Sequence, residues 1–251
     1  MIVYLAGFKT IEKTWNNSTK DIYLLSSFWE HKNGTFGEYV TQDKHILDSG
    51  AFSAINDKTG KYKNFDWDEY VKKYIAFIKH TKQKLFFELD IDCVVGLNKV
   101  EYYRNQIEDA IGIPPIVCWH ANRGADYWIK SCEDYPYVAL GTTTASNAGK
   151  KIRANPKILH WFINHAHKNK AKIHGLGFTA TPWLKELKFD SVDSTTWNVG
   201  GKFGNVIVFN NDGFPTQRYK SNKNMKAKTI ELNLYNFEQW VKFQKYAEHN
   251  L

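Results

Sequence analysis

Short apolar runs alternate with amphipathic stretches along most of this chain. The runs lie at residues 2–6, 22–28, 45–48, 84–91, 115–119, 137–141, 172–178 and 189–193. Between most of them apolar residues recur at helical spacing, as at 67–78 and 158–163. Strands that alternate with helices predict a parallel sheet, and eight of them predict an α/β fold of the (β/α)8 TIM-barrel type. The first two connections show little helical pattern, so a doubly wound sheet is the alternative.

The pattern changes after residue 197. The run 205–209 is followed by Asn-Asn-Asp-Gly, which indicates a strand entering a turn, and residues 234–243 predict a terminal helix with an Asn cap. With 251 residues and 43% hydrophobic content, the chain can bury one large core. We expect a single domain over 1–251, with a barrel core over about 1–197 and an extension over about 198–251 that decorates or closes it.

The formal charge of +8 predicts a polyanionic partner, with nucleic acid as the first candidate. From Tyr135 to Lys185 there is no Asp or Glu, and a second acid-free run surrounds residues 218–228. Such runs are often only solvated faces, but this asymmetry also suits phosphate contacts. The candidate contacts are Lys150, Lys151, Arg153, Arg218, Lys220 and Lys223.

Cysteine and histidine spacing gives no sign of a disulfide framework or a metal site. Cys93, Cys118 and Cys132 are odd in number and lack C-x-C or C-x-x-C spacing. His160, His165 and His167 do not have the i,i+4 spacing that places two ligands on one helix face, so we expect no metal and no cofactor. No apolar stretch approaches 18 residues, and the first residues are too short for a signal peptide. The sequence therefore predicts a cytoplasmic protein without membrane contact.

The run 84–91 ends among acidic residues. Strand alternation places Leu85, Phe87, Leu89 and Ile91 on one face, toward the helices, and Glu88, Asp90 and Asp92 on the other, toward the barrel lumen. Two carboxylates about 6 Å apart repel by roughly 3 kcal/mol at an effective dielectric near 20, so a ligand, a cation or a bound proton must compensate. The alternative is an internal salt-bridge network.

Two other apolar runs end in carboxylates beside small or hydroxylated residues. The first, 45–52, contains Asp48, and the second, 189–197, contains Asp190 and Asp193. About 145 residues separate them, so only a folded barrel or sheet brings them together. Asp190 and Asp193 have opposite strand parity, so a regular strand directs only one of them into the lumen.

Five segments resemble motifs of the tRNA-guanine transglycosylases, in the same order. The segment 47–52, Leu-Asp-Ser-Gly-Ala-Phe, resembles the family's Asp-Ser-Gly-Gly-Phe motif. The segment 189–194, Phe-Asp-Ser-Val-Asp-Ser, resembles its Ile-Asp-Met-Phe-Asp-Cys segment, which carries the nucleophilic aspartate. Residues 89–93 resemble its Phe-Asp-Glu-Cys base-recognition strand, 137–141 its Tyr-Ala-Leu/Ile-Gly-Gly strand, and 174–177 its Met-Gly-Val-Gly strand. The resemblance covers roughly residues 40–200.

The chain departs from the tRNA-directed members in two respects. Those members are longer and carry a zinc site of three cysteines and a histidine near the carboxyl end, whereas no cysteine follows Cys132 here. Residues 194–197 read Ser-Thr-Thr-Trp instead of Pro-Thr-Arg. The compact form looks more like the zinc-less relatives that insert 7-deazaguanine into DNA, including phage-encoded ones. The resemblance therefore implies a pentosyltransferase that exchanges guanine in DNA for a free 7-deazaguanine base, with tRNA as the alternative substrate.

The chemistry of base exchange assigns roles to the acids. Breaking an N-glycosidic bond passes through an oxocarbenium-like transition state, which a carboxylate at the anomeric carbon stabilises or captures covalently. Asp193 is the preferred nucleophile and Asp190 the alternative, while Asp48 suits the general acid/base. A carboxylate that accepts two hydrogen bonds suits the guanine edge, and both Asp90 and Asp92 are candidates. The other candidate substrate contacts are Ser49, Gly50, Phe52, Glu88, His120, Gly141, Gly175 and Gly177.

Two other classes of function are compatible with the same residues. A (β/α)8 glycoside hydrolase would use two of the acids and act on oligosaccharides without needing the basic runs. A nucleic-acid-binding module would use the acids only to hold a structural cation.

Overall fold

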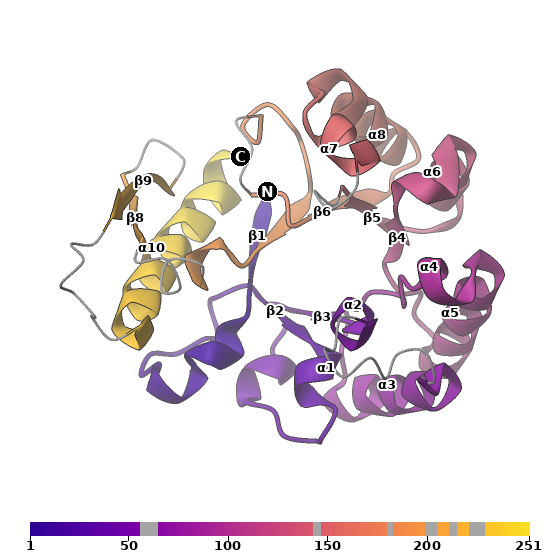
Figure 1. The fold of residues 1–251 in the computed structure, drawn as a ribbon, viewed down its shortest axis with the longest axis horizontal. Helices are drawn as coiled ribbons and strands as arrows, with labels where there is room; N and C mark the ends of the chain where they lie inside the picture. Colours follow the sequence, from indigo (N-terminus) through magenta and orange to yellow (C-terminus); the bar gives the residue numbers. More distant parts are fainter. Residues whose placement is uncertain (56–64, 143–146, 180–182, 199–204, 211–214, 221–228) are drawn as a thin grey trace.

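Seven parallel strands form one curled sheet in the computed structural model (Figure 1). The structure describes residues 1–55, 65–142, 147–179, 183–198, 205–210, 215–220 and 229–251. The strands are β1 (Ile2–Ala6), β2 (Leu24–Ser27), β3 (His45–Asp48), β4 (Val117–Trp119), β5 (Tyr137–Gly141), β6 (Lys172–Leu176) and β7 (Ser191–Ser194). Their order is β3-β2-β1-β7-β6-β5-β4, so the first strand lies beside the last. Seven of the eight predicted runs are strands of this sheet, which confirms the α/β fold with a parallel sheet.

Helices connect the strands along the outside of the curl (Figure 1). They are α1 (Phe28–His31), α2 (Ala51–Ile55), α3 (Trp67–Thr81), α4 (Asp92–Val95), α5 (Leu97–Ile111), α6 (Gly124–Asp134), α7 (Asn147–Arg153) and α8 (Pro156–Lys168). Short 3-10 turns add η1 (Phe8–Thr10), η2 (Glu12–Thr14), η3 (Glu38–Thr41) and η5 (Ala121–Arg123). The predicted helices at 67–78 and 158–163 are confirmed as α3 and α8, which begin at the side-chain caps Asp66 and Asn155.

Two hydrophobic clusters show how the sheet curls. The inner cluster contains only residues of the strands and of the segments just before or beside them: Tyr4, Ala6, Leu25, Ile46, Phe87, Ile116, Cys118 and Ala139. The outer cluster joins the other strand face to the helices. A doubly wound sheet would have helices on both faces, whereas here side chains of the sheet fill the concave side. The architecture is therefore TIM-like.

The run 84–91 forms no regular strand. Leu47 pairs with Phe86 and Phe87 pairs with Ile116 through isolated parallel bridges, so this segment joins the two edges of the sheet. The last ladder bond runs from the Glu88 N–H to the carbonyl of Ile116 at 3.0 Å, and beyond it the pairing stops. The sheet is thus a partial barrel, and the prediction of a closed eight-stranded barrel is met only in part.

The predicted alternation within this run is also wrong in part. Leu85 and Phe87 pack in the inner cluster, whereas Leu89 and Ile91 belong to the outer one. Alternation needs a continuous strand, and here the ladder ends after Phe87. The acidic residues that follow therefore take positions that strand parity does not predict.

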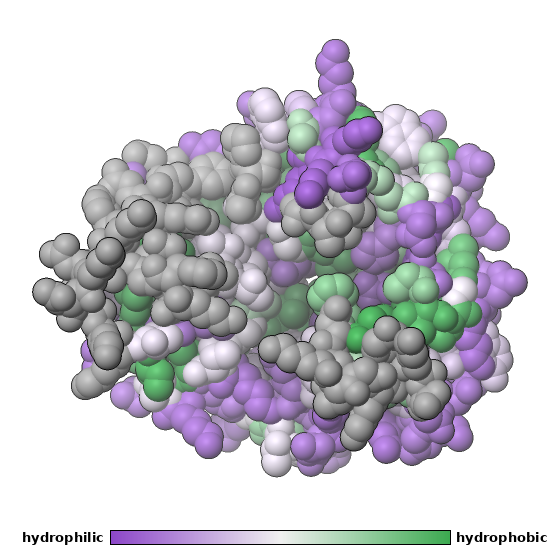
Figure 2. Space-filling view, in the orientation of Figure 1, coloured by the Kyte–Doolittle hydropathy of each residue, from purple (hydrophilic) through white to green (hydrophobic). Residues whose placement is uncertain are grey.

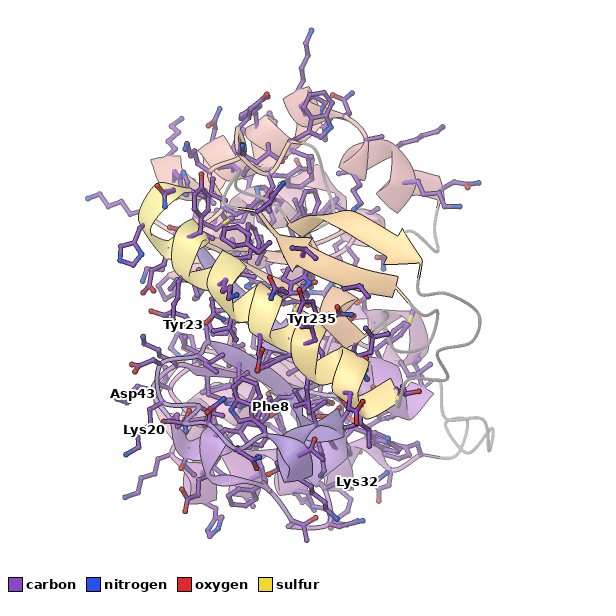
Figure 3. All side chains as sticks on the ribbon, turned by 90° about the vertical axis from the view of Figure 1, so that its left-hand side faces the viewer. Phe8, Lys20, Tyr23, Lys32, Asp43 and Tyr235 are labelled. Carbon is purple, nitrogen blue, oxygen red and sulfur yellow. The ribbon has the colours of Figure 1, made fainter. Side chains whose placement is uncertain are left out.

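The carboxyl-terminal extension packs on the first strand of the sheet. It comprises an antiparallel pair, β8 (Asn205–Phe209) and β9 (Pro215–Lys220), and the helix α10 (Thr229–Asn250), which contacts β1 and β8 (Figure 3). The helix begins upstream of Asn233, so the expected Asn cap near residue 234 is wrong; Asn233 and Asn236 are buried within it. The helix covers the side of β1 that the thin first crossovers leave open.

Gln244 fixes α10 to the sheet. Its amide nitrogen donates to the carbonyls of Val3 at 2.6 Å and Tyr23 at 2.8 Å, and its oxygen accepts from the N–H of Tyr23 at 3.1 Å. Tyr23 lies beside the helix in Figure 3. Within the described ranges, no helix combines the length and the apolar character that crossing a bilayer requires.

Replacing Gln244 by Leu should lower the free energy of unfolding by about 1–3 kcal/mol, because the buried N–H of Tyr23 loses its acceptor and the carbonyl of Val3 a donor. Urea unfolding followed by circular dichroism measures the change. Gln106→Leu on the exposed side of α5 is the control and should change stability by less than about 0.5 kcal/mol. Equal stabilities for the two variants would contradict a docking role for Gln244.

Candidate active site

A cavity of about 780 Å³ opens at the carboxyl end of the parallel strands. Its wall is formed by Ala6, Gly7, Leu25, Ser27, Glu30, Asp48, Phe52, Asp90, His120, Gly141, Thr142, Arg153, Leu176, Gly177, Asp193 and Thr195. Every position around the curl contributes, since each of these residues lies at or just after a strand end or on the following turn or helix. The elements α2, α4 and α7, which follow strand ends, lie toward the viewer in Figure 1. Figure 2 shows this face as largely hydrophilic, with apolar surface gathered toward the right, near α4.

Asp193 is held on the cavity wall by two donors to the same oxygen. The N–H of Gly177 donates to Oδ1 at 2.6 Å, and His174 Nε2 lies 3.2 Å from that atom. Gly177 has a φ of +60°, which a residue with a Cβ rarely adopts, and this turn directs its N–H at the carboxylate. The side chain of Asp193 is 14% exposed. One carboxylate oxygen is thus anchored, and no described hydrogen bond occupies the other.

Asp190 lies outside the cavity. It precedes β7 at the amino end, where its Oδ2 accepts from the N–H of Ile173 at 2.8 Å and lies 3.0 Å from His167 Nε2. Its environment is that of a loop carboxylate that caps a strand. Of the two alternative nucleophiles, the geometry places only Asp193 against the cavity.

Asp48 ends β3 on the same cavity wall. Burial raises its pKa to about 7, and the nearby charges of Asp90 and Asp193 act in the same direction, while a hydrogen bond from the N–H of Gly50 opposes them. A carboxyl group with this pKa exchanges its proton near neutral pH, which suits a general acid that later acts as a base.

Asp90 and His120 form a hydrogen-bonded pair across the cavity. His120 Nε2 lies 3.0 Å from Asp90 Oδ2. Burial lowers the pKa of His120, but the hydrogen bond and the charge of Asp90 outweigh it, so the pKa is raised overall. Gly141 makes room for the imidazole, since a Cβ there would lie 2.4 Å from His120 Cε1 and Nδ1. The pair therefore presents a carboxylate of fixed orientation to a ligand.

Glu88 and Asp92 do not line the cavity. Glu88 is fully buried, and Arg123 Nη1 binds its Oε1 at 2.6 Å, while the N–H of Cys118 donates to the same oxygen at 2.9 Å. Arg123 Nη2 also binds Asp92 Oδ1 at 2.7 Å. Burial raises the pKa of Glu88, whereas Arg123 overcomes the burial of Asp92 and lowers its pKa. For these two acids the salt-bridge interpretation holds, and only Asp90 of the three remains available to a ligand.

The segment after β3 has one exposed and two structural residues. Ser49 is buried, and its carbonyl accepts from the Tyr70 hydroxyl at 2.7 Å. Gly50 has a φ of +72°, and a Cβ there would lie 2.5 Å from Ser27 Oγ, so this glycine allows the close approach of two strand ends. Phe52 on α2 is 71% exposed and lines the cavity, where its ring can cover a ligand.

Gly175 and the predicted basic contacts fall in different surroundings. Gly175 is buried within β6, where a Cβ would lie 2.9 Å from Phe178 Cβ, so it serves packing. On α7, Lys150 and Lys151 are exposed, while Arg153 lines the cavity and donates to the carbonyl of Gly177 at 2.7 Å. Arg218 and Lys220 belong to β9, and Lys223 lies outside the described residues.

Four further cavity or support residues escaped the sequence interpretation. Glu30 follows β2 on α1, and burial raises its pKa. Thr142 and Thr195 line the wall, and the buried Thr142 hydroxyl has no hydrogen-bond partner among the described residues. His174 supports Asp193 from inside the sheet. Of these four, only Thr142 and Thr195 could have been found from the sequence, because they are polar residues next to predicted strand ends.

The cavity thus brings together three aspartates from three positions of the curl, with Arg153 and His120 beside them. In the described ranges, no three His, Cys, Asp or Glu side chains are grouped closely enough to hold a metal ion. Neither a protein-family model nor a curated protein matches this sequence.

Replacing Asp48 by Asn should stabilise the protein at alkaline pH. Because the pKa of Asp48 rises from 3.8 to about 7 on folding, the folded chain binds this proton more tightly, and stability falls as pH rises from about 4 to 7. Removing the ionisation should therefore raise the free energy of unfolding at pH 8, by up to about 4 kcal/mol for a three-unit shift, and change it little near pH 4.

Urea unfolding at pH 4, 6 and 8 measures this difference. Asp126→Asn, at an exposed site on α6, is the matched control and should show no such trend. Parallel pH profiles for the Asp48 variant and the wild-type protein would show that Asp48 titrates in the folded state as it does in water.

Proposed function

We propose that this chain exchanges guanine in DNA for a free 7-deazaguanine base through a covalent aspartyl-sugar intermediate. The observation that carries the proposal is the placement of Asp48 and Asp193 on one cavity, with the pKa of Asp48 near 7. One acid that can give and take a proton and one anchored carboxylate are what glycosyl transfer through a covalent intermediate requires. The resemblance of residues 40–200 to guanine transglycosylases supports the same reaction.

In the first half-reaction, Asp193 attacks the anomeric carbon of the target nucleotide. The free carboxylate oxygen forms the bond to C1′ as the bond from C1′ to guanine N9 breaks. Asp48 in its protonated form donates to the departing base, which leaves as neutral guanine. The charge of Asp193 also stabilises the oxocarbenium-like transition state before the new bond is complete.

In the second half-reaction, the incoming base replaces guanine in the same pocket. Asp48, now ionised, accepts the N9 proton of the 7-deazaguanine, and N9 attacks C1′ while the ester bond to Asp193 breaks. Asp193 regains its negative charge and Asp48 its proton, so the enzyme returns to its starting state. The cycle consumes no cofactor.

Asp90 is the residue that we assign to recognition of the base. Its carboxylate, oriented by His120, accepts from the ring N–H and the exocyclic amine that guanine and 7-deazaguanine share. Phe52 covers the base from the exposed side of the cavity. A pocket that reads only this shared edge accepts both the leaving and the entering base, as exchange demands.

The nucleic-acid backbone is assigned to the basic residues of α7. Lys150 and Lys151 are exposed on the helix whose Arg153 reaches the cavity wall. A base must leave a duplex to reach the recessed Asp193, so the substrate is a flipped or single-stranded nucleotide. DNA is favoured because the chain lacks the zinc-site cysteines of the tRNA-directed members; the same exchange on tRNA is the second candidate.

The finer features of the fold belong to the same proposal. We take the segment 85–88, bonded to both β3 and β4, as the eighth position of a (β/α)8 barrel. Residues 1–251 then act as one domain, with β8, β9 and α10 closing its amino-terminal side. The proposed place of action is the cytoplasm.

Trapping the intermediate tests the proposal. Wild-type protein incubated with a guanine-containing DNA strand, without incoming base, should form a covalent adduct after denaturing quench, and Asp193→Asn should form none. Asp190→Asn, changed three residues away and outside the cavity, is the control and should retain the adduct. Guanine-labelled DNA and tRNA, each offered with a 7-deazaguanine, identify the polymer by loss of label.

Fragmentation of the adduct peptide must resolve the two aspartates, because trypsin leaves both in residues 189–202. An adduct on Asp190 would refute the assigned nucleophile. Loss of label from tRNA alone would replace DNA as substrate, and no exchange with either polymer would refute the reaction.

Gly141→Ala tests the recognition role of the Asp90–His120 pair. The added methyl would lie 2.4 Å from the imidazole and displace it, which releases Asp90 from its fixed orientation. We expect KM for the incoming base to rise at least about tenfold, a loss of roughly 1.4 kcal/mol in binding. Gly34→Ala, where no atom lies within 4 Å of the new methyl but the φ of +79° strains the backbone, is the control for a destabilising glycine change elsewhere. An unchanged KM would exclude this pair from base binding.

A further inference from the structure

The ring of His174 lies inside the curled sheet next to Asp193. The side chain is fully buried, and its centroid lies 5.2 Å from that of Phe87 and 6.2 Å from that of Tyr4. Both ring nitrogens have polar partners in this apolar setting. Nε2 lies 3.2 Å from Asp193 Oδ1, and Nδ1 lies 2.5 Å from Ser191 Oγ.

The chain of contacts continues to the amino end of the sheet. Ser191 Oγ lies 2.5 Å from the hydroxyl of Tyr137. Ser191 is fully buried at the start of β7, and Tyr137 begins β5. Four side chains from three neighbouring strands thus form one continuous line that ends at the cavity wall.

The hydrogens of this line can be assigned from chemistry. An ionised carboxylate only accepts, so a neutral imidazole beside an ionised Asp193 must carry its ring hydrogen on Nε2 to donate to it. Nδ1 then accepts, and the one hydrogen of Ser191 points at it. Ser191 Oγ in turn accepts from the Tyr137 hydroxyl. Every donor in the line points toward Asp193.

We propose that His174 is a positioning residue for Asp193, and that Ser191 and Tyr137 hold its ring in the required tautomer. This inference rests on the proposed function. The torsion that turns a carboxylate is soft, so an unrestrained Asp193 would present either oxygen to the sugar. His174 and the N–H of Gly177 both bind Oδ1, which leaves the second oxygen directed at the anomeric carbon.

Burial of this polar line is costly unless each member is paired, and its last acceptor is the nucleophile itself. An aliphatic side chain would fill the space between Tyr4 and Phe87 without any polar partner. The buried imidazole therefore depends on the carboxylate as a polar partner, and the carboxylate depends on the imidazole for its orientation.

Three variants and one spectrum test the inference, after the wild-type protein has been shown to form its adduct. His174→Leu should lower kcat about 100-fold with little change in KM, because misdirection of the nucleophile is felt in the transition state. His174→Gln, whose amide N–H can reach Oδ1, should recover at least about tenfold of that loss. Ser191→Ala should lower kcat about tenfold.

The spectrum reports the tautomer without any substrate. In 15N-labelled wild-type protein, the long-range proton–nitrogen correlations of the ring, assigned by their absence in His174→Gln, should show hydrogen on Nε2 alone. In Ser191→Ala they should show a mixture of the two tautomers. Hydrogen on Nδ1 in the wild-type protein would overturn the proposed tautomer and with it the role of Ser191 and Tyr137.

Kinetics and stability together separate positioning from packing. An unchanged kcat in His174→Leu would overturn the positioning role. So would equal decreases of kcat in His174→Leu and His174→Gln that parallel the decreases of their stability in urea. Failure of the wild-type protein to exchange bases would instead refute the proposed function. The tautomer spectrum would still decide whether Ser191 and Tyr137 fix the tautomer of His174.

Discussion

Repulsion between carboxylates in one poorly solvated cavity is the constraint on which this site depends. Asp48, Asp90 and Asp193 all line the cavity, and burial together with the charges of Asp90 and Asp193 raises the pKa of Asp48. Each acid meets the constraint differently. Asp193 is stabilised by two hydrogen bonds and Asp90 by His120, whereas Asp48 keeps a proton near neutral pH. Three identical side chains thus differ in their surroundings, and only Asp48 has a pKa that its surroundings raise to about 7.

Buried ion pairs on either side of Asp90 hold this residue in place where the regular sheet ends. Beyond the N–H of Glu88 the segment lacks ladder bonds, and the side chain of Arg123 binds both Glu88 and Asp92. Asp90 lies between these two anchored acids and is left facing the cavity. The cost of burying the charges of Glu88 and Arg123 is offset in part by their mutual contact and by the N–H of Cys118. The irregular segment thus directs Asp90 into the cavity, whereas a regular strand with Phe87 facing inward would direct it outward.

The sequence was sufficient for those parts of the structure that depend on local pattern. Seven of the eight apolar runs predicted as strands form the sheet, and the convergence of carboxyl ends predicted that Asp48 and Asp193 would line one cavity. Parity within 85–91 failed because the ladder stops at Phe87, an event set by tertiary pairing. The fates of Glu88 and Asp92 depended on Arg123, more than 30 residues away, which no local rule reveals. His174 escaped notice because a single imidazole in an apolar strand is usually structural.

Gly177 links an acidic and a basic residue of the cavity wall. Its N–H holds Oδ1 of Asp193, while its carbonyl accepts from Arg153, the inner residue of the basic helix α7. Burial lowers the pKa of Arg153, and the charge of Asp193 opposes this. The positive φ of Gly177 directs its N–H to Asp193 and its carbonyl to Arg153, and a side chain at this position would strain the turn. Under the proposed function, contact with the nucleic-acid backbone and alignment of Asp193 would therefore depend on the same few backbone atoms.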